Sequence, residues 1–412
     1  MKVLALCRPR LTGLFAALSL YLGMGLGATA PAAVAEFFWA GIHLSDPQLE
    51  RARYEPFLAR TVDPHFRSSQ RGAVSKLLGA LAWDEFAYYE TAAETGYAQE
   101  NMRDVYGVFL AVDRVMRFKP SVVQVAGEAV RKYYTYIFVT LNVFAADSRN
   151  LVFSHPVFLT DAFEQPPSVE DILSETLSEF AEQLGDAENP HTKRIMQRLQ
   201  AYYGPPGRSY EAIRRTKNPI HPIDDYFENT YGVMRLCGDC VGVFDQSGMT
   251  DPPVDMMGAF ARFFLNARLA EFGQVAFLPE QAGKVEEGTG DAAATRKEGD
   301  IRRDFDELCL AEYDETGKSR ICVRVRPPRN PLWIGVRSLV KAAEGPGALV
   351  TLRFLTVVDI EAELAGRAQP VATSLQETGY EVAAVKGEQV SDVYYINGLI
   401  KAINKLDENV LR

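Results

Sequence analysis

Residues 134–144, Tyr-Thr-Tyr-Ile-Phe-Val-Thr-Leu-Asn-Val-Phe, alternate between two kinds of side chain. One side of this run is aliphatic, and the other carries Tyr136, Phe138, Thr140 and Asn142. A period of two residues is typical of a β-strand that buries one face. Turn-forming residues follow at 147–150, and a second apolar run follows at 151–160. The pattern predicts a long β-hairpin, whose second strand is an edge strand or carries a bulge because Pro156 has no N–H to donate.

An amphipathic helix is predicted directly after this hairpin. Ser168 occupies the N-cap position, and Asp171, three residues later, completes a capping box with Asp in place of Glu. Apolar residues recur at helical spacing as far as Leu184, and Gly185 follows where a left-handed C-terminal cap is expected. We interpret the polar face of this helix as a solvated acidic surface made by Glu170, Glu175, Glu179 and Glu182.

Shorter patterns extend the prediction over the rest of the chain. In the first half they predict strands at 37–44, 86–89 and 105–115 and a helix at 71–81. The second half repeats this order, with a strand at 241–244, a helix at 256–272, a strand at 275–278, a hairpin around 314–317, a long strand at 348–364 and a helix at 391–411. We therefore predict an α/β fold of the α+β type, made of two tandem small mixed-sheet modules that are each closed by an amphipathic helix.

The first 35 residues have the pattern of a secretory signal peptide. Three basic residues precede an apolar run at 11–30 that ends at Ala33-Val34-Ala35. Glycines interrupt the run, which favours a cleavable leader over the alternative of a retained anchor. Cys7 precedes the apolar run, so we interpret it as a leader residue and not as a lipid-attachment site.

The organisation of the whole chain follows from its length and its breaks. A chain of 412 residues is long enough for two or three domains. We predict a signal peptide at 1–35, a first α/β module at 36–201, and a second module at 202–412 with a flexible loop at about 281–304. Without the leader the chain keeps 41 basic against 54 acidic residues, which disfavours nucleic acid as a partner. No second apolar run of about 18 residues occurs, so we predict no membrane span after leader cleavage.

Four cysteines follow the leader, the even number that is expected in an oxidising compartment. Cys309 and Cys322 flank the turn at 314–317. If Asp314 pairs with Gly317, Cys309 lies opposite Cys322, and a cross-strand disulfide becomes possible. The alternative is two separately buried thiols.

The other two cysteines form the motif Cys237-Gly238-Asp239-Cys240. This spacing suits a redox pair, half of a zinc site or a structural disulfide. In redox enzymes such a pair begins a helix, whose N-terminus lowers the pKa of the thiol, whereas residues 241–245 predict a strand. A helix that starts at Cys237 would favour an enzyme, and a strand that runs through Cys240 to Phe244 would favour a binding protein.

No catalytic signature accompanies these thiols. The sequence holds no HExxH, GxSxG or P-loop motif, so we predict no catalytic residue, cofactor or metal. The densest polar cluster, at 221–228, is interpreted as a proline-rich connection followed by helix-capping acids. The alternative is a cation site or an acid/base site, since it combines an imidazole with carboxylates.

Aromatic residues on the polar side of the predicted hairpin form a candidate partner surface. Tyr134, Tyr136 and Phe138 would lie on a sheet face, and exposed aromatic side chains often anchor protein interfaces. The alternative is that a helix of the other module covers this face.

The order of the predicted elements resembles the small α/β domain that the amino-terminal module of TolB shares with the CsgG family of envelope proteins. The resemblance rests on two sets of residues, which are 136–143, 147–150 and the helix from Ser168 in the first half, and 241–245, 262–268, 275–279 and 349–359 in the second. Members of these families are generally non-enzymatic and assemble envelope machinery, bind partner proteins or form secretion pores. A pore requires an amphipathic hairpin insertion, which this sequence does not contain.

The resemblance implies an exported binding or assembly protein of the bacterial cell envelope, in the periplasm or otherwise extracytoplasmic. Its partners would be envelope proteins. The alternative is an extracytoplasmic thiol-disulfide or metal-dependent enzyme that uses Cys237 and Cys240.

Overall fold

The fold is taken from a computed structural model of the chain. It describes residues 35–46, 48–81, 86–95, 105–125, 128–147, 149, 151–203, 231–245, 257, 260–261, 263–265, 267–268, 306–314, 317–325, 330–344, 349–364, 367–383 and 392–406. The helices and strands form an α+β fold with two separate mixed sheets, as the sequence predicted for the fold class.

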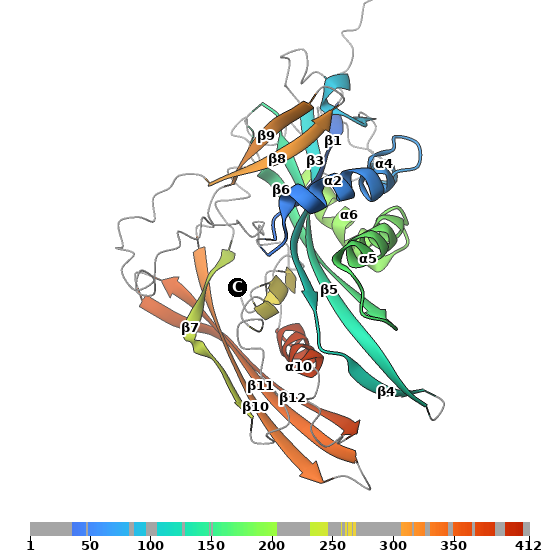
Figure 1. Ribbon diagram of the computed structural model, residues 1–412. Helices are drawn as coiled ribbons and strands as arrows, with labels where there is room; N and C mark the ends of the chain where they lie inside the picture. The colour runs from blue at the N-terminus through green and yellow to red at the C-terminus, as the bar shows by residue number, and fades with distance from the viewer. Residues whose placement is uncertain are drawn as a thin grey trace, which may run out of the picture.

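The first sheet is built around the predicted hairpin (Figure 1). Its strands are β1 (Ala35–Leu44), β2 (Phe86–Tyr89), β3 (Val105–Arg117), β4 (Ser121–Val125), β5 (Glu128–Ala145) and β6 (Leu151–Phe163). β1 pairs in parallel with β2 and β3, whereas β5 pairs antiparallel with β3, β4 and β6. Among the described strands β6 pairs only with β5, so Pro156 lies in an edge strand as predicted.

Helices cover one face of the first sheet (Figure 1). They are α2 (Arg51–Thr61), α3 (Asp63–Arg67), α4 (Ala73–Ala80), α5 (Val169–Leu184) and α6 (Pro190–Tyr203), with a short 3₁₀ turn η1 (Ala92–Glu94). The ring of Trp39 on β1 stacks on Phe66 of α3 with centroids 5.6 Å apart, and Phe66 in turn meets Phe180 of α5. Aromatic packing of this kind joins the helices to the aliphatic face of the sheet.

The predicted caps of α5 are only partly correct. The Ser168 hydroxyl accepts a hydrogen bond from the Asp171 N–H at 3.1 Å, and the Asp171 carboxylate accepts one from the Ser168 N–H at 3.0 Å. The capping box is therefore confirmed. The left-handed cap at Gly185 is wrong, because φ is −78° there and the Gly185 N–H simply closes the last helical turn on Ala181.

The second sheet has the order β12-β11-β10-β7. Its strands are β7 (Tyr231–Asp245), β10 (Asn330–Glu344), β11 (Leu349–Leu364) and β12 (Arg367–Ala383), and helix α10 (Val393–Asn404) follows them. β7 and β10 are parallel and the later pairs are antiparallel, which repeats the pairing order of β1, β3, β5 and β6. The predicted strand at 275–278 and loop at 281–304 lie outside the described residues. Neither β10 nor β12 was predicted from the sequence. The boundary between the two modules at 201 and 202 stays a prediction.

The remaining hairpin, β8 (Asp306–Asp314) and β9 (Gly317–Val325), belongs to neither sheet. β8 contacts β1 and β9 contacts β6. The hairpin thus lies across the first sheet on the side opposite α5 and α6 (Figure 1).

Helical residues fill the space between the two sheets. One hydrophobic core joins Tyr136 and Phe138 of the first sheet, the described helical residues 257, 260, 261 and 263–265, and the inward side chains of β10, β11 and α10. Helix α10 packs on β11 and β12. The molecule therefore has four layers, in the order helices, first sheet, helices and second sheet (Figure 1).

Candidate functional site

The aromatic face of β5 is the first of the predicted sites that the structure locates. Tyr136 and Phe138 are only 4% and 1% exposed. The ring centroid of Phe138 lies 4.9 Å from Phe260 and 3.9 Å from Phe263. The prediction that Tyr136 and Phe138 form an open partner surface is wrong, because helical residues of the second half of the chain cover both rings. The alternative prediction, cover by a helix of the other half, describes what is seen.

Tyr134, the third residue of that predicted surface, is partly exposed and lines a groove. The groove has a volume of about 520 Å³ and is lined by Ser121, Tyr134, Tyr136, Thr160, Asp161, Ala162, Glu179, Val393, Tyr394 and Asn397. These residues come from β4, β5, β6, α5 and α10. The groove therefore lies where the first sheet meets α10.

Two residue pairs in the β5–β6 ladder define the geometry of the groove. Tyr134 lies opposite Ala162 and Tyr136 lies opposite Thr160 in the β5–β6 ladder, so these four residues share one sheet face. Asp161 points to the other face, where its carboxylate accepts a hydrogen bond from the Thr176 hydroxyl of α5 at 3.3 Å. Because residues of both faces line it, the groove wraps around the free edge of β6.

The phenols and amide of the groove supply neutral hydrogen-bonding groups. Burial raises the pKa of the Tyr136 hydroxyl, and burial likewise raises the pKa of the Tyr394 hydroxyl. Both phenols are thus neutral at ordinary pH and can donate as well as accept a hydrogen bond. Asn397 stands one turn after Tyr394 on α10 and adds an amide.

Two carboxylates complete the lining. Asp161 is partly exposed, and Glu179 is exposed and accepts a hydrogen bond from the Gln183 side chain at 3.0 Å. Among the described residues that line the groove, none is basic. Glu179 is exposed, as the prediction of a solvated acidic surface requires, and it also forms part of the wall of this groove.

Sequence reasoning missed most of this site. Only Tyr134 and Tyr136 were singled out, and their partners in the groove lie up to about 260 positions away in the chain. One signal was available: Tyr394 and Asn397 lie one turn apart beside the apolar stripe of the last helix.

The two predicted cysteine pairs lie on strands. β7 runs through Cys237 and Cys240, and its ladder with β10 passes from Leu236–Ile334 to Val241–Val336. One β10 residue, Gly335, therefore spans the four residues of the motif, which bulge out of the ladder. In the second pair, Asp314 lies opposite Gly317 and Cys309 opposite Cys322, so the predicted register of the hairpin is confirmed.

This register predicts a disulfide between Cys309 and Cys322. Pairs in an antiparallel hairpin alternate between hydrogen-bonded and non-hydrogen-bonded, and counting from the closing pair at Asp314 puts the cysteines in a non-hydrogen-bonded pair. The Cα separation of such a pair, roughly 4.5 Å, suits a disulfide. We expect a peptide map without reduction to show the 309–322 link, and reduction to lower the free energy of unfolding by about 3 kcal/mol. As a control, replacement of Cys237 and Cys240 by Ser should preserve the link. Alkylation of Cys309 and Cys322 in unreduced, unfolded protein would contradict the prediction.

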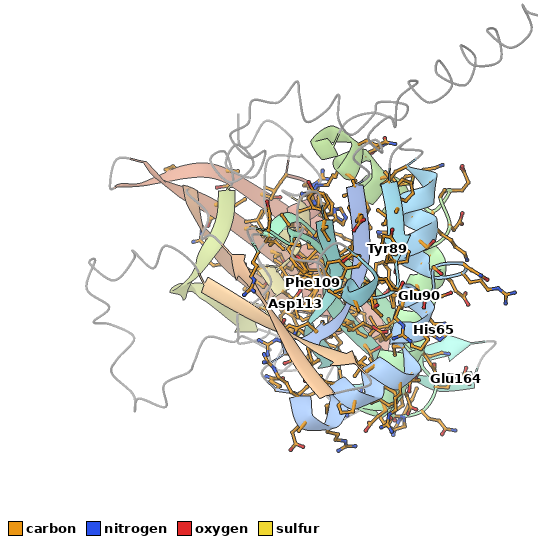
Figure 2. All side chains as sticks on the ribbon, turned by 90° about the horizontal axis from the view of Figure 1, so that it is seen from above. His65, Tyr89, Glu90, Phe109, Asp113 and Glu164 are labelled. Carbon is orange, nitrogen blue, oxygen red and sulfur yellow. The ribbon has the colours of Figure 1, made fainter. Side chains whose placement is uncertain are left out.

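A buried polar patch lies on strands β1, β3, β5 and β6 of the first sheet. The Thr140 hydroxyl donates to the Asp113 carboxylate, and both residues are buried. In the described part of the chain, the ring nitrogens of His43, the amide oxygen of Asn142 and the hydroxyl of Ser154 have no hydrogen-bond partner. Figure 2 shows Asp113 and Phe109 toward the inside of the molecule, with His65, Glu90 and Glu164 at its periphery.

His43 makes the stability of the protein pH-dependent. Burial, with help from the positive charge of Arg51, lowers the pKa of His43 from 6.5 to about 3. Below pH 6.5 the unfolded chain binds a proton at this residue and the folded chain does not, so stability falls as the pH falls from 6.5 toward 3. The expected contribution is about 1.4 kcal/mol per pH unit. In a His43→Leu variant, the slope of the free energy of unfolding between pH 6.5 and 5 should be smaller by that amount. Equal slopes in denaturant titrations of the two proteins would show that the imidazole is hydrated in the folded state.

The described residues offer no other candidate centre. None of their His, Cys, Asp and Glu side chains gather in a group of three that could hold a metal ion. The polar cluster at 221–228 lies outside the described residues. No helix in the described ranges is both long enough and apolar enough to cross a membrane.

Comparison with known proteins adds little to this geometry. No family model and no curated protein matches the sequence. One similar solved structure is a protein assigned as a neuraminyllactose-binding hemagglutinin homologue from Helicobacter pylori, with 10% identity and a TM-score of 0.25 over 42% of this chain and 94% of that one. A similarity of this size carries no argument about function.

Proposed function

We propose that this protein is an exported, extracytoplasmic binding or assembly protein of the bacterial cell envelope, and that it acts without catalysing a reaction. The observation that carries the proposal is the groove, whose phenol, hydroxyl, amide and carboxylate groups converge on one open space of about 520 Å³. Its size is within the range of ligand sites, and neutral Tyr hydroxyls beside aromatic faces suit recognition. The leader pattern supports export, and the resemblance to the TolB and CsgG domains supports an envelope role.

The alternative enzyme would use the thiols of Cys237 and Cys240. A catalytic CxxC pair relies on a helix N-terminus to stabilise its thiolate. Here both cysteines lie within strand β7, which continues through Phe244. A strand that runs through Cys240 to Phe244, and not a helix that starts at Cys237, was the feature expected of a binding protein. The backbone of β7 therefore favours that function.

Site-specific crosslinking in intact cells tests the proposed function. A photo-reactive phenylalanine analogue placed at Tyr134 would lie in the groove, and the same analogue at the exposed Glu188 provides the control. We expect a discrete crosslinked envelope protein from position 134 and none from position 188. Cell fractionation and N-terminal sequencing should find the protein outside the cytoplasm and beginning near Glu36. A cytoplasmic protein with an intact N-terminus, or identical crosslinks from both positions, would refute the proposal.

A further inference from the structure

The lining of the groove is negatively charged. Asp161 and Glu179 line it, and none of its described lining residues is basic. The nearby Lys132 is already paired with Glu164, with the ammonium nitrogen 2.9 Å from the carboxylate. The whole chain has a formal net charge of −10. A positively charged ligand is therefore attracted both by the groove and by the protein that surrounds it.

The uncharged groups of the groove also suit a cation with N–H donors. Tyr134 and Tyr394 are partly exposed, so their rings and hydroxyls can meet a ligand. A tyrosine ring can pack against the aliphatic stem of a long basic side chain. The buried Ser121 hydroxyl lies beside the Tyr394 hydroxyl, so both belong to the polar lining of the groove.

The position of the groove indicates how a ligand enters. It wraps around β6, which has no second partner strand among the described residues. A polypeptide can lie along such an edge and place one side chain into the groove. The volume of about 520 Å³ exceeds that of a single ammonium group and has room for a long side chain with its backbone.

From these observations we propose that the groove binds a Lys or Arg side chain on an exposed segment of a partner protein, between the carboxylates of Asp161 and Glu179. This inference rests on the proposed function and specifies the chemistry of the partner. The basic head would donate hydrogen bonds to the two carboxylates on the α5 side of β6. The stem of that side chain and its backbone would pass the edge of β6 toward the rings of Tyr134 and Tyr394.

Binding of model peptides to the purified protein tests the inference. The probes are dye-labelled heptapeptides Gly-Ser-Gly-X-Gly-Ser-Gly with a C-terminal amide, where X is Lys, Arg, Gln or Glu. In fluorescence anisotropy we expect the Lys and Arg peptides to bind at least about tenfold more tightly than the Gln peptide, with the Glu peptide weakest. Glu179→Gln and Asp161→Asn should each weaken the Lys and Arg peptides roughly fivefold and leave the Gln peptide unchanged.

A matched control separates local from general charge effects. Glu188→Gln removes the same charge from an exposed site outside the groove, and it should leave all four affinities unchanged. Unaltered thermal midpoints would show that the groove variants remain folded. The inference is overturned if the Gln peptide binds as tightly as the Lys peptide, or if Glu188→Gln weakens binding as much as the groove variants do. It is also overturned if free N-acetyl-lysine amide competes as well as the whole peptide, since the occupant would then be a small amine.

The two proposals can fail separately. Suppose that position 134 crosslinks to an envelope protein in cells while the Lys and Arg peptides bind no more tightly than the Gln peptide. In that case the proposed function stands, and the inference that the groove binds a basic side chain is wrong. If the peptides bind as expected but no partner is captured in cells, the envelope function is wrong and the chemistry of the groove stands.

Discussion

Phe138→Ala should destabilise the protein by about 3 to 5 kcal/mol, because it removes a buried ring from the core between the two sheets. Phe138 is 1% exposed, and its ring meets those of Phe260, Phe263 and Phe264. Neither sheet can close the resulting cavity without moving against the other. Denaturant unfolding followed by circular dichroism measures the change.

An exposed apolar side chain provides the control for that experiment. Leu375 on β12 is 55% exposed, so Leu375→Ala should change the free energy of unfolding by less than about 0.5 kcal/mol. A loss below about 1 kcal/mol for Phe138→Ala, where cavity formation costs several times more, would mean that the two sheets do not share this core.

Asp46→Ala should cost a similar amount, about 3 to 5 kcal/mol, because it removes one partner of a buried ion pair. Asp46 is fully buried and lies just after β1, beside a bulge in β3 between Val112 and Arg114. β1 ends before it can pair with this part of β3. The Asp46 carboxylate takes the place of a strand, accepting the Val115 N–H at 2.8 Å and lying 3.6 Å from the Arg114 guanidinium.

Asp186 offers a control with the same local hydrogen bond. Asp46 accepts the N–H of Gln48 at 2.9 Å, and the exposed Asp186 accepts the N–H of Glu188 at 3.0 Å, two residues on in each case. Asp186→Ala should therefore cost only about 0.5 to 1 kcal/mol, the net value of one exposed hydrogen bond. Equal losses for the two variants in denaturant unfolding would show that the buried pair with Arg114 contributes nothing.

Local patterns in the sequence predicted local structure well. The alternation at 134–144, the capping box at Ser168 and Asp171, and the strand register that sets Cys309 opposite Cys322 are all present in the structure. Each depends on residues within about a dozen positions of one another, where strand period and turn length leave few choices. Gly185 is the exception, since several backbone conformations can end a helix and only the packing around it selects one.

The sequence by itself determined the α+β class, the long β5–β6 hairpin with the helix that follows it, and which face of β5 is aliphatic. Only the tertiary structure decided that Tyr136 and Phe138 are covered, and that Tyr134, Asp161, Glu179 and Asn397 line one groove. The reason is physical: alternation shows that a strand has two faces but does not show what packs on the second one. That choice depends on how the two sheets and α10 associate, through contacts between residues more than a hundred positions apart in the chain.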